Sequence, residues 1–87
     1  MKKVKLLLVE DETDVLQNNR EYFEGKGYEA VCAATLAKAR FQLEEHSPDL
    51  ILLDVMMPDG SGFDFCAELR QKTNAPIIFL TGRDENE

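Results

Sequence analysis

The sequence predicts an α/β domain built around a parallel β-sheet. Short, almost wholly apolar runs alternate along the chain with longer segments in which apolar residues recur at helical spacing. The apolar runs do not alternate with polar residues, which is typical of strands that are buried on both faces. Turn-forming glycines and prolines separate the segments. Strands that alternate with helices in this way form βαβ units with a parallel sheet.

The first strand and helix are predicted over residues 4–9 and 12–25. The strand is apolar apart from Lys5, and the helix places apolar side chains at helical spacing. Gly25 and Gly27 follow the last helical turn, where glycine commonly ends a helix.

The second strand is expected over residues 28–33, and Thr35 caps a second helix that runs to about Glu45. One face of this helix is apolar and consists of Leu36, Ala39 and Leu43. The third strand covers residues 50–53 and ends at Asp54.

A turn over residues 58–62 follows the third strand. Ser61 and Asp64 have the spacing of a capping box, which predicts a third helix to about Lys72. The core side of this helix consists of Phe65, Cys66 and Leu69. After another turn, residues 77–81 are predicted to form the fourth strand.

Composition excludes several classes of protein. The 87 residues suffice for one small domain, and the net charge of −7 argues against direct nucleic-acid binding. No apolar run approaches the ~20 residues of a membrane helix. Acidic residues follow the lysine-rich start, so a secretory signal is not expected. Cys32 and Cys66 lie far apart without a nearby histidine, which favours two free thiols over a zinc site. We therefore expect a cytoplasmic protein.

Polar side chains follow three of the predicted strands. Glu10 and Asp11 follow the first strand, Asp54 the third, and Thr81 ends the fourth. The carboxyl ends of parallel strands meet at one edge of a sheet, where ligands of open α/β sheets bind. Converging carboxylates repel one another unless a cation lies between them, and Mg²⁺ prefers carboxylate, water and phosphate oxygens. The sequence therefore indicates a site for Mg²⁺ and a phosphoryl group.

These segments resemble the receiver domain of two-component response regulators along the whole chain. The acidic pair Glu10-Asp11 is similar to the metal-binding pair of that family. Residues 50–62, Leu-Ile-Leu-Leu-Asp-Val-Met-Met-Pro-Asp-Gly-Ser-Gly, are similar to its phospho-acceptor segment. Residues 77–81 correspond to the strand whose terminal Ser or Thr hydrogen-bonds the phosphoryl group. The resemblance implies a flavodoxin-like, doubly wound parallel sheet with strand order 2-1-3-4.

The resemblance also implies a role for each site residue. Asp54 is the nucleophile that takes a phosphoryl group from a sensor histidine kinase or phosphotransfer protein. Asp11, Asp54 and the backbone carbonyl of Met56 bind Mg²⁺, and Glu10 acts largely through water. Thr81 bonds the transferred group. Such a domain assists its own phosphorylation and dephosphorylation without being an enzyme, and it controls an output domain, commonly a transcription regulator.

The resemblance implies a receiver domain over residues 1–87 that is truncated after its fourth strand. The fourth helix, the fifth strand with its lysine and aromatic switch residue, and the fifth helix are absent from the sequence. The apolar residues of the third and fourth strands, 50–53 and 77–80, would then meet water on one face. The fourth strand would also have an open edge. Self-association of the chain, or a loosely folded monomer, is expected.

The sequence is also compatible with two other functions. One is a receiver-like interaction module that is not phosphorylated, since a fold does not by itself determine a function. The other is a Mg²⁺-dependent phosphohydrolase of the haloacid dehalogenase type, which needs an acid two residues after its nucleophile. Met56 occupies that position here.

Overall fold

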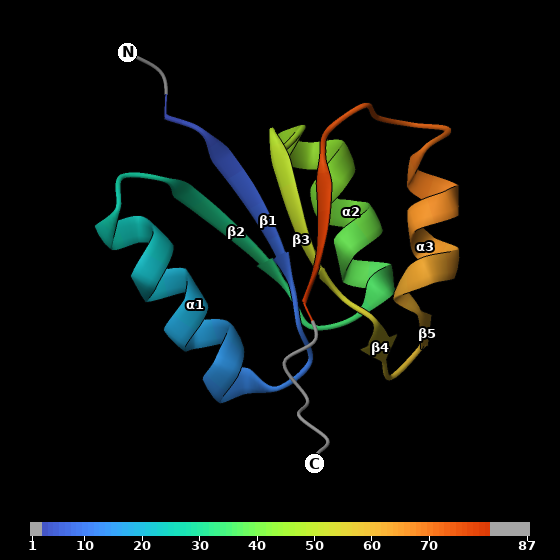
Figure 1. Ribbon diagram of the computed structural model, residues 1–87, viewed down its shortest axis with the longest axis horizontal. Coiled ribbons are helices and arrows are strands. Elements are labelled where there is room, and N and C mark those ends of the chain that lie inside the picture. Colours follow the sequence, from blue (N-terminus) through green and yellow to red (C-terminus); the bar gives the residue numbers. More distant parts are fainter. Residues whose placement is uncertain (1–2, 81–87) are drawn as a thin grey trace.

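The computed structural model describes residues 3–80, which form a four-stranded parallel sheet with helices on both faces (Figure 1). The strands follow the order β2-β1-β3-β6, so the predicted order 2-1-3-4 is confirmed, with β6 as its fourth strand. These strands are β1 (Lys5–Val9), β2 (Glu29–Ala33), β3 (Leu50–Asp54) and β6 (Ile77–Leu80). The helices are α1 (Thr13–Gly25), α2 (Leu36–His46) and α3 (Gly62–Leu69).

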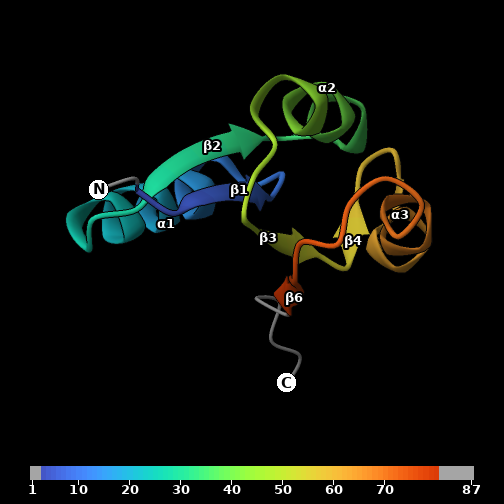
Figure 2. The same cartoon turned by 90° about the horizontal axis from the view of Figure 1, so that it is seen from above.

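The helices cover the two faces of the sheet unequally. Residues that alternate along β1 and β3 fall into two separate clusters, as expected for strands whose side chains point to opposite faces. Figure 2 shows α2 and α3 together on one side of the sheet, with α1 on the other. The α2 and α3 side holds the larger cluster, built on Leu7, Val9, Ile51, Leu53, Phe65 and Leu69. The α1 side holds Leu6, Leu8, Ala30 and Leu52, with Leu16 and Phe23 of α1 packed against them.

Local signals in the sequence place most helix ends correctly. The side chain of Thr35 accepts a hydrogen bond from the Lys38 amide at 3.1 Å, and Ser61 accepts one from Phe63, also at 3.1 Å. Helix α3 ends at Leu69, three residues before the predicted Lys72. The extra residues form a turn in which the amides of Lys72 and Thr73 both donate to the Leu69 carbonyl.

A short antiparallel hairpin was not predicted. Its strands are β4 (Met56–Met57) and β5 (Gly60–Ser61), directly after β3. Strands of two residues are too short to show a period-2 pattern, so the sequence indicates only the turn between them. The hairpin joins the end of β3 to the start of α3.

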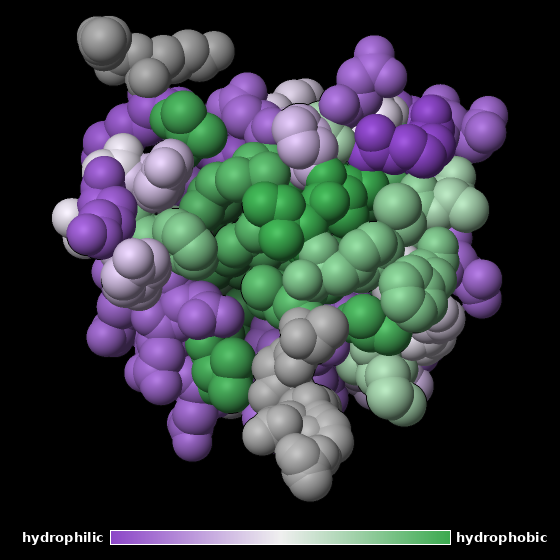
Figure 3. All heavy atoms as spheres, in the orientation of Figure 1, coloured by the Kyte–Doolittle hydropathy of each residue, from purple (hydrophilic) through white to green (hydrophobic). Residues whose placement is uncertain are grey.

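The prediction that apolar side chains of the third strand, β3, meet water is wrong. The same prediction for the fourth strand, β6, is partly confirmed. Leu52 is only 5% exposed because it packs in the α1-side cluster, and Ile51 and Leu53 are fully buried. In β6, by contrast, Ile78 is 50% exposed and the other residues are half-buried. Figure 3 shows an apolar surface over the strands on the face seen there. Burial on the α1 side therefore ends at β6.

Both cysteines are free and half-buried in the structure, which agrees with the two separate thiols expected from sequence. Cys66 packs against the larger cluster and Cys32 against the smaller one. None of the described helices combines the length and the apolar composition that a membrane span requires.

Candidate functional site

Three carboxylates meet at the carboxyl ends of the central strands. Glu10 directly follows β1, and Asp54 is the last residue of β3. The two strands pair in parallel with Val9 opposite Leu53, so their ends are level at this edge of the sheet. Carboxylate oxygens of Glu10, Asp11 and Asp54 lie within 4.8 Å of one another. The tertiary convergence expected from the strand ends is present.

The negative charges of the three carboxylates are buried or half-buried without a neutralising cation among the described residues. Glu10 and Asp54 are 4% and 7% exposed, and Asp11 is half-buried. Burial raises the pKa of Glu10, and the neighbouring carboxylates of Asp54 and Asp11 raise it further; a hydrogen bond from the Glu12 amide opposes this rise. None of the ion pairs between described residues reaches any of the three.

One carboxylate oxygen has no hydrogen-bond donor. Oδ1 of Asp11 is buried without a partner among the described residues, whereas Glu10 accepts from the Glu12 amide at 3.0 Å and Asp54 from the Met56 amide at 3.4 Å. A buried oxygen without a donor is costly in an apolar setting. Clustered carboxylate oxygens are also the donor set that hard divalent cations prefer. The residues present therefore fit a divalent metal ion, which would satisfy the oxygen and reduce the repulsion.

The segment after Asp54 folds back tightly against it. The Gly62 amide donates to the Val55 carbonyl at 2.6 Å, which brings the start of α3 against the end of β3. A Cβ on residue 62 would collide with the Asp54 carbonyl oxygen and crowd Val55. Only glycine allows this close approach of two backbones.

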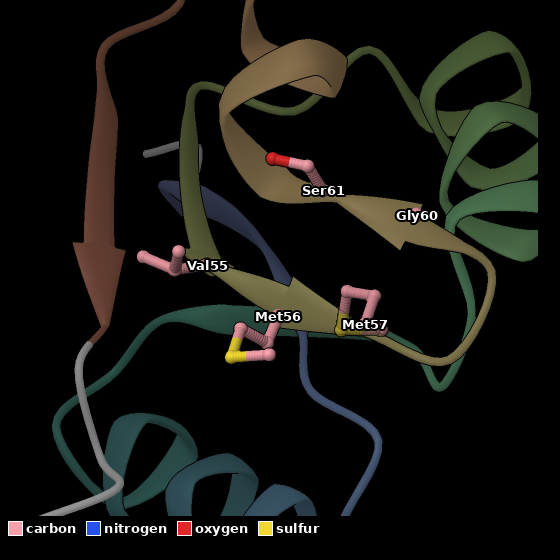
Figure 4. A pocket seen from close by; sticks show the side chains of 5 residues that line it. All are labelled: Val55, Met56, Met57, Gly60 and Ser61. Atoms are coloured by element: carbon pink, nitrogen blue, oxygen red, sulfur yellow. The ribbon is translucent and has the colours of Figure 1, made fainter.

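The hairpin and the residue before it line an open pocket of about 360 Å³, formed by Val55, Met56, Met57, Gly60 and Ser61 (Figure 4). The two methionines differ in their surroundings. Met57 is 8% exposed and belongs to the larger core cluster, whereas Met56 is 72% exposed. The pocket therefore presents the apolar side chain of Met56 to solvent.

The predicted site residues are only partly assembled in the described part of the chain. Glu10, Asp11 and Asp54 lie together, and the Met56 backbone contacts Asp54. Thr81 lies outside the described residues. The last described residue, Leu80, is the register partner of Asp54.

The sequence interpretation placed Gly62 in the turn at residues 58–62 but did not foresee its close approach to the Asp54 backbone. It missed the role of Asp59, for which the sequence carries no signal. Its carboxylate accepts hydrogen bonds from the amides of Leu36 and Ala37, which lie on another element.

Comparison with known proteins gives a consistent match. A family model described as the response regulator receiver domain matches residues 6–87. The KDP operon transcriptional regulatory protein KdpE of Escherichia coli is 39% identical over 80 residues, which cover 92% of this chain and 36% of KdpE. The response regulator SaeR of Staphylococcus aureus is 38% identical over 81 residues, covering 92% of this chain and 35% of SaeR. The chain thus spans about a third of the length of these curated relatives.

Solved structures agree with the fold. The receiver domain of the Francisella response regulator 1452 superposes with a TM-score of 0.86 at 29% identity, covering 97% of this chain and 70% of that one. A two-component response regulator from Clostridium difficile gives a TM-score of 0.90 at 27% identity, covering 97% of this chain and 69% of that one. The flavodoxin-like, doubly wound sheet is confirmed.

The close approach at Gly62 predicts the cost of a single methyl group. Gly62→Ala should lower the free energy of unfolding by about 1–3 kcal/mol, because the added Cβ meets backbone atoms that cannot move aside. Gly25→Ala is the matched control, since its Cβ would enter open space and should be neutral or stabilising by up to ~1 kcal/mol. Urea denaturation of both variants measures the difference. Equal stabilities would show that the backbones are not in close contact.

Proposed function

The chain belongs to the response regulator receiver domain family, and we propose that it is a phospho-accepting signalling switch of a two-component phosphorelay. The observation that carries the proposal is the carboxylate cluster. Asp54 ends the central strand β3, with Glu10 and Asp11 within 4.8 Å of it. In this proposal residues 1–87 form a single receiver domain.

The proposed reaction uses Asp54 as a nucleophile. A carboxylate oxygen of Asp54 forms a bond to phosphorus while the phosphorus–nitrogen bond of a donor phosphohistidine breaks, leaving an aspartyl phosphate. The Met56 amide, 3.4 Å from Oδ1, orients the carboxylate. Thr81 is proposed to donate its hydroxyl to the transferred group. The chain assists its own phosphorylation and dephosphorylation but is not otherwise an enzyme.

Mg²⁺ is the proposed cofactor, and it would neutralise charge on the phosphoryl oxygens when bound. The proposed ligands are Asp11, Asp54 and the backbone carbonyl of Met56, with Glu10 acting through water. The unpaired Oδ1 of Asp11 supports this assignment, because a buried carboxylate oxygen without a donor requires another partner.

The proposed partners are a sensor histidine kinase or phosphotransfer protein and an output domain. KdpE is named as a transcriptional regulatory protein and SaeR as a response regulator, and the matched residues cover only 36% and 35% of their lengths. We therefore propose an output in transcription that residues 1–87 control without binding DNA themselves, since their net charge is −7. The two free thiols suit a cytoplasmic location.

Phosphorylation of one residue tests the function. Incubation with acetyl phosphate and Mg²⁺ should add one phosphoryl group, because Asp54 is the proposed nucleophile, and Asp54→Asn should abolish the addition. Intact mass spectrometry measures both, and Asp64→Asn, on the exposed first turn of α3, is the control. Wild-type protein that stays unmodified would favour a non-phosphorylated interaction module, and steady hydrolysis of a phosphomonoester such as p-nitrophenyl phosphate would favour a phosphohydrolase.

The proposed metal site has a consequence for stability. Without Mg²⁺, Asp11→Asn should raise the free energy of unfolding by about 1–2 kcal/mol, because it removes one of three crowded charges. Coulomb's law gives ~4 kcal/mol for a pair of unit charges at 4 Å and an effective dielectric constant of 20, an upper bound here. Added Mg²⁺ should then stabilise the wild type more than the variant.

Urea denaturation with and without Mg²⁺ measures this effect. Asp14→Asn is the control, because Asp14 is exposed in the first turn of α1 and outside the carboxylate cluster. If Mg²⁺ stabilised wild type and Asp11→Asn equally, Asp11 would not be a ligand.

We also propose that the chain self-associates through β6. Among the described residues this strand pairs only with β3, its sequence Ile-Ile-Phe-Leu contains no charge or proline, and Ile78 is 50% exposed. Size exclusion with light scattering should give a mass above the monomer that Ile78→Lys reduces. Phe41→Lys, at a more exposed site on α2, should not reduce it. A wild-type monomer at high micromolar concentration would contradict the proposal.

A further inference from the structure

Asp59 connects two elements that are distant in sequence. Its Oδ1 accepts a hydrogen bond from the Leu36 amide at 2.9 Å, and its Oδ2 accepts one from the Ala37 amide at 3.1 Å. Both amides belong to the first turn of α2. The amides of a first helical turn have no carbonyl acceptor within the helix. The amide of Leu36 lowers the pKa of the Asp59 carboxyl, so the side chain is ionised at neutral pH. Asp59 therefore caps α2 from a separate loop.

Helix α2 already has a cap of its own. Thr35 Oγ1 accepts a hydrogen bond from the Lys38 amide at 3.1 Å, so it serves the next amide of the same turn. Capping by a local Thr is the ordinary arrangement at a helix start. The second cap also connects α2 to the hairpin, because its carboxylate comes from the turn between β4 and β5.

The hairpin that carries Asp59 also contacts Asp54. Its strands pair Met56 with Ser61 and Met57 with Gly60, and the Met56 amide donates to Asp54 Oδ1 at 3.4 Å. The Leu36 side chain lies against Gly60, where an added Cβ would be 3.0 Å from its methyl group. The start of α2 thus contacts the hairpin through both polar and apolar groups.

We propose that Asp59 is a positioning residue that fixes the Met56 backbone beside Asp54. The inference rests on the proposed function in one respect, since the Met56 carbonyl is a proposed Mg²⁺ ligand. Two anchors then hold the segment between β3 and α3. Gly62 fixes its end against Asp54, and Asp59 fixes its turn against α2. Without the second anchor the hairpin keeps its cross-strand pairs but loses its connection to α2.

Two cap variants separate positioning from capping. Asp59→Ala and Thr35→Ala each remove a side-chain cap from the same turn of α2, and only the first releases the hairpin. We expect Mg²⁺ affinity to fall about tenfold in Asp59→Ala, at the lower end of what outer-shell partners of a metal site contribute, and to change less than about twofold in Thr35→Ala. Asp59→Asn keeps an acceptor oxygen at this position and should recover part of the loss. Equal losses of Mg²⁺ affinity in Asp59→Ala and Thr35→Ala would show that Asp59 only caps α2 and does not position Met56.

A metal-free measurement keeps this test independent of the proposed function. Amide hydrogen exchange of Met56 and Met57 should accelerate at least tenfold in Asp59→Ala and stay within about twofold of wild type in Thr35→Ala. If wild type bound no Mg²⁺ and accepted no phosphoryl group, the proposed function would fail while this readout still decided the positioning role. Unchanged exchange in Asp59→Ala would overturn the inference.

Discussion

Three carboxylates crowd together at one edge of the sheet, and the folded protein must hold them there against their mutual repulsion. Glu10, Asp11 and Asp54 are brought together by the parallel pairing of β1 with β3, and two of them are almost fully buried. Burial of charge and repulsion between like charges both oppose folding; burial is the main cause of the raised pKa of Glu10, and the neighbouring carboxylates raise it further. A domain with a net stability of ~5–15 kcal/mol holds such a cluster only if its core is well packed. The site is therefore destabilising by itself, and a bound cation would relieve it.

The core that opposes this repulsion is built from the same strands. Alternate residues of β3 enter opposite clusters, with Ile51 and Leu53 toward α2 and α3 and Leu52 toward α1. Because the side-chain period is two, a shift of one residue in register would exchange the two faces and move Asp54 away from Glu10. The packing that fixes the register thus also fixes the distance between the carboxylates. The strand is anchored on both faces directly before the charged residue.

The sequence predicted those features that depend on local patterns. Apolar runs and helical spacing indicated the four long strands and three helices, and Asp54 and Glu10 were found because each follows such a run. Contacts between residues that are distant in the sequence do not produce such a local pattern. The hairpin strands are too short to show a period, and the partners of Asp59 lie on another element. The burial of Leu52 depends on a cluster with residues of β1 and β2. These features depend on tertiary contacts, which the periodicity of a sequence does not show.

Carbon-detected NMR titration of the Glu10 carboxyl group would show directly whether the buried carboxylates are strained in the folded protein. In the metal-free protein we expect a pKa above the ordinary value for glutamate, with burial as the main cause and the neighbouring carboxylates adding to it. Asp54→Asn should lower this pKa part of the way, and Mg²⁺ should lower it in the wild type, because each reduces the negative charge beside Glu10. A metal-free pKa at or below the ordinary value, unaffected by either change, would show that the three carboxylates are not under strain.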